Sequence, residues 1–290
     1  MSVLDLRRLA RIWGIAIETI DYPRSSGGRV RGYFFHRVSG SGEALIFTHG
    51  AGNDALFPQI TLLASLARQG FRVLAFDGDG HGRDSSTTFD PACIESSFED
   101  AAKAAFPGVR YQDISILGHS LGGAIALQSA LGGLPWRCAI GAGVPIGASL
   151  RISILKEGLA PVCPGFWREA RSWTFPFGIL PALGPFRRQA FPIRLAAKSK
   201  KEGEDSYLSV IMNYLKSIPW DNLGRDRQTS TRICILGGQW DALAPPKDVL
   251  CLGRWLNAQT RVVSRANHFT LLMAGEAHSH IAHFIRGSNK

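Results

Sequence analysis

The segment Gly118-His119-Ser120-Leu121-Gly122 constrains this chain more than any other part of its sequence. Apolar residues at 114–117 come directly before it, and the small and apolar residues 123–131 come directly after it. This order predicts a strand, a sharp turn and a helix, with Ser120 at the turn and glycines on either side that let the chain turn so tightly. The alternative interpretation is an ordinary glycine-rich connection between a strand and a helix.

Short apolar segments alternate with helical periods along most of the chain. The predicted strands lie at 44–48, 72–76, 113–117, 137–144, 232–236 and 260–264. Residues 15–22 and 30–37 predict an antiparallel hairpin at the start of the sheet. The alternation predicts an α/β fold with a mostly parallel central sheet and helices on both faces. Ligands of such sheets gather at the carboxyl ends of the strands, where the glycine-rich turns of this chain fall.

Residues 148–226 interrupt the alternation, with seven prolines and ten aromatic residues. We therefore expect residues 1–147 and 227–290 to form the core, and 148–226 to be an inserted, mainly helical cap with a helix at 206–217. Aromatic residues lie next to cations at 165–168, an arrangement typical of lids that face lipid. An acyl chain under a lid is one interpretation, and a small core of the cap itself is the other.

The net charge of +10 is unevenly distributed. Residues 41–147 carry 6 Lys and Arg against 10 Asp and Glu, whereas residues 148–232 carry 14 against 7. A nucleic-acid-binding protein would not be acidic around its chemical centre, so we expect no nucleic-acid partner. The basic excess instead indicates an anionic substrate or an attachment surface, such as peripheral contact with an anionic membrane.

Cysteine usage and the N-terminal segment favour a cytoplasmic protein. The five cysteines are scattered, which predicts reduced thiols. The first 20 residues predict an amphipathic helix and not a secretory signal, and no apolar run reaches the roughly 20 residues of a membrane span. The oligomeric state is left open.

A serine hydroxyl becomes a nucleophile when a base accepts its proton and an acid orients that base. After a turn of this kind the expected order along the chain is Ser, acid, His. Asp241 follows the predicted strand 232–236, and His268 follows the next strand, so both would reach the sheet edge at which Ser120 lies. The alternative role for Asp241 is to cap the helix that begins near Pro245.

Other histidines fit the role of the base less well. His36 precedes the serine, and His278, His280 and His283 fall in the last predicted helix. Residues at i and i+2 of a helix point apart, and no carboxylate or cysteine ligand stands nearby in sequence, so these three predict no metal site.

The oxyanion of an ester intermediate needs two hydrogen-bond donors. The backbone N–H of Leu121 is one candidate, and that of Ala51, in the loop His49-Gly50-Ala51-Gly52, is the other. Gly50 and Gly52 would let the backbone approach a substrate closely, and we expect His49 and His119 to border the substrate as well. The alternative is that this loop is merely tight.

Three segments together resemble the α/β-hydrolase superfamily: His49-Gly50-Ala51-Gly52-Asn53, residues 77–85, and residues 118–126. The most similar branch is that of monoacylglycerol lipase and the lysophospholipase-like serine hydrolases, which share the H-G-A-G and G-H-S-x-G-G-A-I-A patterns. Asn53 departs from the acidic residue frequent in that branch. The resemblance covers roughly residues 40–147 and 228–275.

The resemblance implies an α/β-hydrolase fold with a triad of Ser120, Asp241 and His268, an oxyanion hole of Ala51 and Leu121, and no cofactor. It also implies that the loop 77–82 shapes the pocket without reacting. The predicted function is hydrolysis of a carboxylic ester, favouring an acyl-lipid or a medium- or long-chain ester, through an acyl-enzyme on Ser120. Thioesterases, acyltransferases, peptidases and C–C bond hydrolases use the same triad, and a non-catalytic ligand-binding protein is the remote alternative.

Overall fold

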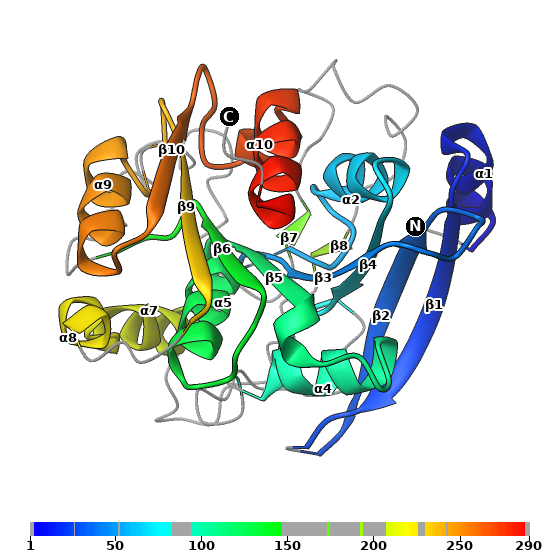
Figure 1. Cartoon of the computed structure of the whole chain (residues 1–290), viewed down its shortest axis with the longest axis horizontal. Helices are drawn as coiled ribbons and strands as arrows, with labels where there is room; N and C mark the ends of the chain where they lie inside the picture. The colour runs from blue at the N-terminus through cyan, green and yellow to red at the C-terminus, as the bar shows by residue number, and fades with distance from the viewer. Residues whose placement is uncertain are drawn as a thin grey trace.

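The computed structural model describes residues 3–25, 27–51, 53–82, 94, 96–146, 173–174, 192–193, 207–225, 230–241 and 243–287. Within these residues eight strands form one sheet in the order β1-β2-β4-β3-β5-β6-β9-β10, which runs from right to left in Figure 1. β1 (Ala16–Pro23) is antiparallel to β2 (Arg29–His36), and β2 is antiparallel to β4 (Phe71–Phe76). All other neighbours in this sheet are parallel.

The remaining strands of the sheet are β3 (Glu43–Thr48), β5 (Ile114–His119), β6 (Cys138–Ala142), β9 (Arg232–Gly238) and β10 (Gln259–Val263). The predicted α/β fold is confirmed, and each predicted strand corresponds to an observed one. The sequence pattern also predicts one last helix at about 270–285, but the observed structure differs, because Ala274 adopts an extended conformation with ψ of 129°. The segment therefore divides into a 3-10 turn, η4 (Leu271–Met273), and the helix α10 (Gly275–Arg286).

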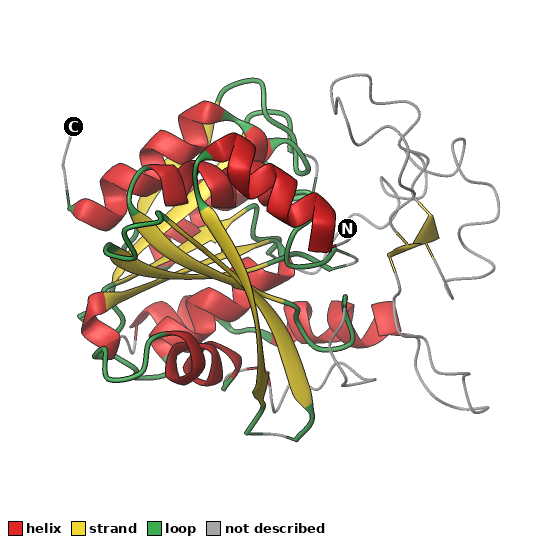
Figure 2. Cartoon of the chain, turned by 90° about the vertical axis from the view of Figure 1, so that its right-hand side faces the viewer, coloured by secondary structure: helices red, strands yellow, loops and turns green. Residues whose placement is uncertain are grey.

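Helices cover both faces of the sheet (Figure 2). Residues from α1 (Val3–Trp13), α2 (Ile60–Arg68) and α10 share one buried apolar cluster. The other face is covered by α4 (Ser97–Ala105), α5 (Leu121–Leu131), α7 (Tyr207–Ser217), α8 (Trp220–Arg225) and α9 (Pro246–Trp255). Because side chains alternate along a strand, β3 sends Ile46 into this second cluster and Phe47 into the first. Burial on both faces is what a parallel sheet requires.

Part of the predicted cap lies among the described residues. It includes α7, α8 and a short antiparallel pair of strands, β7 (Trp173–Thr174) and β8 (Pro192–Ile193). The predicted helix at 206–217 corresponds to α7, whose Ile211 and Leu215 are buried in the cluster around α5. Tyr214 of α7 donates a hydrogen bond to Gln128 of α5. The aromatic segment 165–168 lies outside the described residues, so its role as a lid stays a prediction.

No helix in the described part of the chain combines the length and the apolar character needed to span a membrane.

The turn between β5 and α5 depends on glycines. Ser120 has φ of 53° and ψ of −116°, a left-handed conformation that L residues rarely adopt. A Cβ on Gly118 would overlap the carbonyl of Gly122, and a Cβ on Gly122 would lie 2.5 Å from the carbonyl oxygen of His49. β5, α5 and the end of β3 can therefore pack together only because positions 118 and 122 carry no side chain.

Replacement of Gly118 by alanine tests this constraint. We expect Gly118→Ala to lower the free energy of unfolding by about 3 kcal/mol, because the backbone of α5 must move away from β5. The matched control is Gly275→Ala, since a Cβ there meets no atom within 4 Å. The control should change stability by less than about 1 kcal/mol. Urea unfolding of both variants measures the difference, and equal stabilities would contradict the steric account.

Candidate active site

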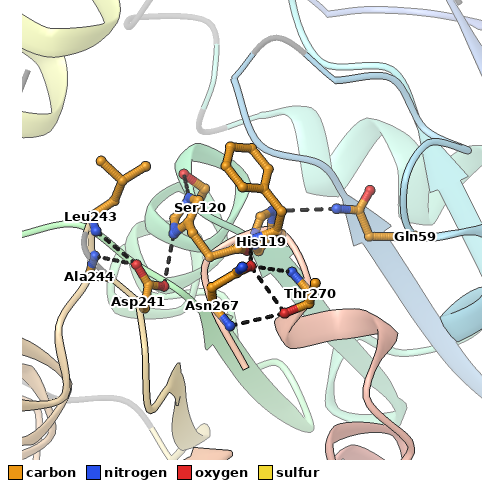
Figure 3. Close-up of polar contacts among 10 residues, drawn as sticks. Gln59, His119, Ser120, Asp241, Leu243, Ala244, Asn267 and Thr270 are labelled. Atoms are coloured by element: carbon orange, nitrogen blue, oxygen red, sulfur yellow. Dashed lines mark hydrogen bonds and ion pairs between the residues drawn. The ribbon is translucent and has the colours of Figure 1, made fainter. Parts of the chain in front are cut away.

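The three residues of the predicted triad meet at the carboxyl edge of the sheet (Figure 3). Ser120 lies on the turn after β5, Asp241 follows β9, and His268 follows β10. His268 Nδ1 lies 2.9 Å from Asp241 Oδ2, and His268 Nε2 lies 3.0 Å from Ser120 Oγ. Side chains that are 27 and 148 residues apart in sequence thus form one hydrogen-bonded chain.

The carboxylate of Asp241 is buried and held on both oxygens. Its Oδ1 accepts hydrogen bonds from the N–H groups of Leu243 at 2.9 Å and Ala244 at 2.8 Å, and its Oδ2 faces His268. The N-cap of α9 is Pro245, which makes no side-chain capping bond. The alternative that Asp241 caps this helix is therefore wrong, and the carboxylate is oriented toward the imidazole.

The hydrogen bonds fix the tautomer of His268. A carboxylate only accepts hydrogen bonds, so Nδ1 carries the proton and donates a hydrogen bond to Asp241. The lone pair on Nε2 then points to the hydroxyl of Ser120, which donates to it. Both separations fall in the range expected for a nucleophile next to its base and a base next to its orienting group.

The loop after β3 lies against the nucleophile turn. The N–H of Gly122 donates to the carbonyl of His49 at 3.1 Å, which joins this loop to the start of α5. A Cβ on Gly50 would lie only 2.9 Å from Cβ of Ser120. Ala51 is exposed, and Gly52 lies outside the described residues. The loop is therefore adjacent to the serine, as the sequence predicts.

The imidazole of His49 fixes the shape of this loop. Its Nδ1–H donates to the carbonyl of Gly50 at 2.8 Å, and its Nε2 accepts from the N–H of Gly78 at 2.9 Å. The carbonyl of Gly50 also accepts from the N–H of Asn53 at 3.2 Å. Since C=O and N–H point in opposite directions across a trans peptide, these bonds also set the direction of the Ala51 N–H.

A family model described as the alpha/beta hydrolase family matches residues 45–280. The chain belongs to this family. Its fold and the placement of Ser120 at the strand–helix turn agree with the resemblance found in the sequence.

Curated relatives match part of the sequence, and solved structures share the fold. Protein phosphatase methylesterase 1 of Bos taurus is 33% identical over 97 residues, which span 33% of this chain and 26% of the relative. A thioesterase domain from the curacin biosynthetic pathway has a TM-score of 0.63 at 17% identity and covers 93% of this chain and 99% of its own. An esterase of Pyrococcus furiosus has a TM-score of 0.67 at 14% identity over 96% of this chain and 93% of its own. At such identities the structures show the fold alone.

Three further histidines of this α/β hydrolase are buried around the site. Burial lowers the pKa of His49 to about 4, that of His81 to about 3 and that of His119 to about 3. The Nδ1–H of His81 donates to the carbonyl of Asp79 at 2.8 Å, and its ring meets that of His49 edge-on at 4.9 Å. All three are neutral near pH 7 and bond to backbone groups.

The positions of His49 and His119 bear on their predicted contact with substrate. His49 is 3% exposed and His119 is 1% exposed. His119 Nε2 lies 2.9 Å from the carbonyl oxygen of His268, and its Nδ1 lies 3.5 Å from Nε2 of Gln59. Gln59 carries no local sequence signal, because it meets His119 only through the fold. Substrate contact by either histidine stays a prediction.

A narrow cavity of about 10 Å³ lies beside the start of α5. Its walls come from β3, the loop after β4, and helices α4 and α5. Gly78 and His81 contribute to one side, and Leu121 and Ile125 contribute to the other. A space of this volume is about the size of one water molecule, so it is too small to hold a substrate group.

The buried histidines predict acid sensitivity of the fold. Their folded-state pKa values lie below the ordinary 6.5, so the unfolded chain binds more protons between these values. Stability is therefore retained above pH 6.5 and is lost as the pH falls toward 4. Three such groups give a slope of up to about 4 kcal/mol per pH unit.

Urea unfolding at a series of pH values between 7 and 4.5 measures this slope. His81→Asn keeps a donor for the Asp79 carbonyl but removes one titrating group, so its slope should be smaller by up to about 1.4 kcal/mol per pH unit. A stability that stays constant between pH 6.5 and 4.5 would contradict the buried, neutral state of these rings.

Proposed function

We propose that this α/β hydrolase cleaves a carboxylic ester through an acyl-enzyme on Ser120. The observation that carries the proposal is the continuous hydrogen-bonded chain from Asp241 through His268 to Ser120. A serine in this state has a base within reach, and the base has a buried acid that fixes its tautomer.

The reaction follows from this arrangement. Ser120 Oγ attacks the ester carbonyl while His268 Nε2 takes its proton, and Asp241 stabilises the resulting imidazolium. The tetrahedral intermediate collapses, the C–O bond to the alcohol breaks, and His268 returns the proton to the departing alcohol. Water activated by His268 then attacks the acyl-enzyme, which releases the acid and restores Ser120.

Ala51 and Leu121 are the proposed oxyanion donors. Leu121 begins α5, where the helix N-terminus concentrates backbone N–H groups and positive potential. The Gly50–Ala51 peptide is held by His49 and lies next to Ser120. Two preorganised donors of this kind stabilise the developing charge without reorganisation during the reaction.

An apolar acyl chain is the proposed substrate feature. The aromatic residues next to cations in 148–226 favour it, and so do two aromatic side chains close to the triad. Trp240 is 62% exposed and precedes Asp241, while Phe269 is 46% exposed and packs edge-on against His268. Solvent-exposed aromatic groups at this edge offer contacts to an apolar chain.

Ester hydrolysis is favoured over the other reactions of the same triad by one further observation. The similar bovine protein is named a methylesterase, and an ester is the bond that this name specifies. The thioesterase title belongs to a structure that shares the fold at 17% identity. Thioester hydrolysis is therefore the second candidate, with the same residues in the same roles.

A chain-length series of p-nitrophenyl esters tests both the bond and the substrate. We expect hydrolysis with a higher kcat/KM for octanoyl than for acetyl ester, because a longer chain buries more apolar surface. Ser120→Ala should lower kcat by about 10⁴-fold or more.

The outcomes separate the two parts of the proposal. No turnover by the wild type, or equal turnover by Ser120→Ala, would remove the function. A preference for acetyl over octanoyl would remove the acyl-lipid part alone. An octanoyl thioester cleaved faster than the octanoyl ester would favour the second candidate.

A further inference from the structure

The proposed base comes from a distant part of the sheet. Ser120 follows β5, whereas His268 follows β10 at the edge, and β6 and β9 lie between them. Three steps between neighbouring strands amount to about 14 Å. The loop that carries His268 must therefore cross the ends of two strands and stop within hydrogen-bonding distance of Ser120.

Several hydrogen bonds join this loop to the residues that follow β9, and others lie within the loop. The N–H of Trp240 donates to the carbonyl of Ala266 at 2.8 Å, and the N–H of Arg265 donates to the side chain of Gln239 at 2.9 Å. The side-chain oxygen of Asn267 accepts from the N–H of Thr270 at 2.9 Å (Figure 3). These bonds shape the loop near its origin, but they do not reach β5.

His119 supplies a bond from β5 itself. It is the last residue of that strand, directly before the nucleophile, and its Nε2 lies 2.9 Å from the carbonyl oxygen of His268. The two imidazole rings lie 4.9 Å apart between their centroids. Residues 119 and 120 thus form two hydrogen bonds with residue 268, one to its main chain and one to its ring.

The protonation of His119 suits this bond. A carbonyl oxygen only accepts, so Nε2 carries the proton, and the lone pair on Nδ1 faces the amide of Gln59 at 3.5 Å. Both side chains are 1% exposed. Burial and the neighbouring His268 lower the pKa of His119, so the ring stays neutral and adds no positive charge beside the base.

We propose that His119 is a positioning residue, whose Nε2–H bond to the main-chain carbonyl of His268 holds the proposed base in register with Ser120. The inference rests on the proposed function and adds a role that the G-x-S-x-G pattern does not specify. Misplacement of a reacting group by about 1 Å can cost 10²-fold in rate, so a main-chain anchor at the base matters to the reaction. In this role His119 acts through His268 and does not contact substrate.

Replacement of His119 by glutamine or by asparagine distinguishes the roles of its two ring nitrogens. The amide of glutamine reaches the position of Nε2, whereas the shorter amide of asparagine reaches that of Nδ1. His119→Gln therefore keeps a donor toward the His268 carbonyl, and His119→Asn loses it. We expect His119→Asn to lower kcat on p-nitrophenyl octanoate by about 10- to 100-fold with KM within about threefold of the wild type. His119→Gln should restore kcat at least tenfold over His119→Asn.

A measurement on the wild type keeps the test decisive if both His119 variants fold poorly. The ¹⁵N chemical shifts of the His119 ring at neutral pH report which ring nitrogen carries the proton. We expect the proton on Nε2, because Nε2 lies 2.9 Å from the carbonyl oxygen of His268, which only accepts. Thermal unfolding of each variant shows whether the fold is intact.

The results distinguish this inference from the proposed function. If Ser120→Ala is inactive but His119→Asn matches His119→Gln in kcat, the positioning role is wrong and the function stands. A parallel rise in KM with the fall in kcat, or a proton on Nδ1 of His119 in the wild type, would also overturn the positioning role. If Ser120→Ala is as active as the wild type, the proposed function itself fails.

Discussion

The left-handed turn at Ser120 is the constraint on which the rest of the site depends. A residue in this region of φ and ψ costs about 1–3 kcal/mol, and it persists only where its surroundings hold it. Here the N–H of Ser120 donates to the carbonyl of Ala142 in β6 at 2.7 Å, and the N–H of Gly122 donates to His49 after β3 at 3.1 Å. Strands on both sides of β5 thus hold the strained turn, and in doing so they bring the loop after β3 against the serine.

Backbone contacts made by buried histidines organise the site around that turn. His49 fixes the peptide that precedes Ala51, and His119 reaches the main chain of His268. Each ring is neutral because burial lowers its pKa, so each can offer one donor and one acceptor at fixed positions. Family membership and a hydrogen-bonded Ser120, His268 and Asp241 support acyl transfer chemistry, with hydrolysis of an ester as the proposed outcome.

Much of this arrangement could be predicted from the sequence, because the patterns that indicate it lie within short segments of the chain. Apolar strands followed by glycine-rich turns predict the parallel sheet, and chain order points to Asp241 and His268. The bond from His119 to residue 268 could not be predicted in this way, because it joins positions 149 residues apart and depends on how the loop after β10 crosses the sheet. Gln59 carries no motif, and the extended conformation of Ala274 interrupts a helical pattern that continues through it in the sequence. Residues 148–226 lack strand–helix alternation, so their pattern predicts a mainly helical insertion with one helix at 206–217, but not the strands β7 and β8.

Labelling with a fluorophosphonate probe, followed by peptide mass spectrometry, tests the central claim most directly. The probe forms a covalent bond with a serine only where the hydroxyl is activated and the developing charge is stabilised. We expect one modified serine, Ser120, in the wild type at neutral pH, and no modification in Ser120→Ala. Absence of labelling in the wild type, or a label that stays on another residue in Ser120→Ala, would contradict it.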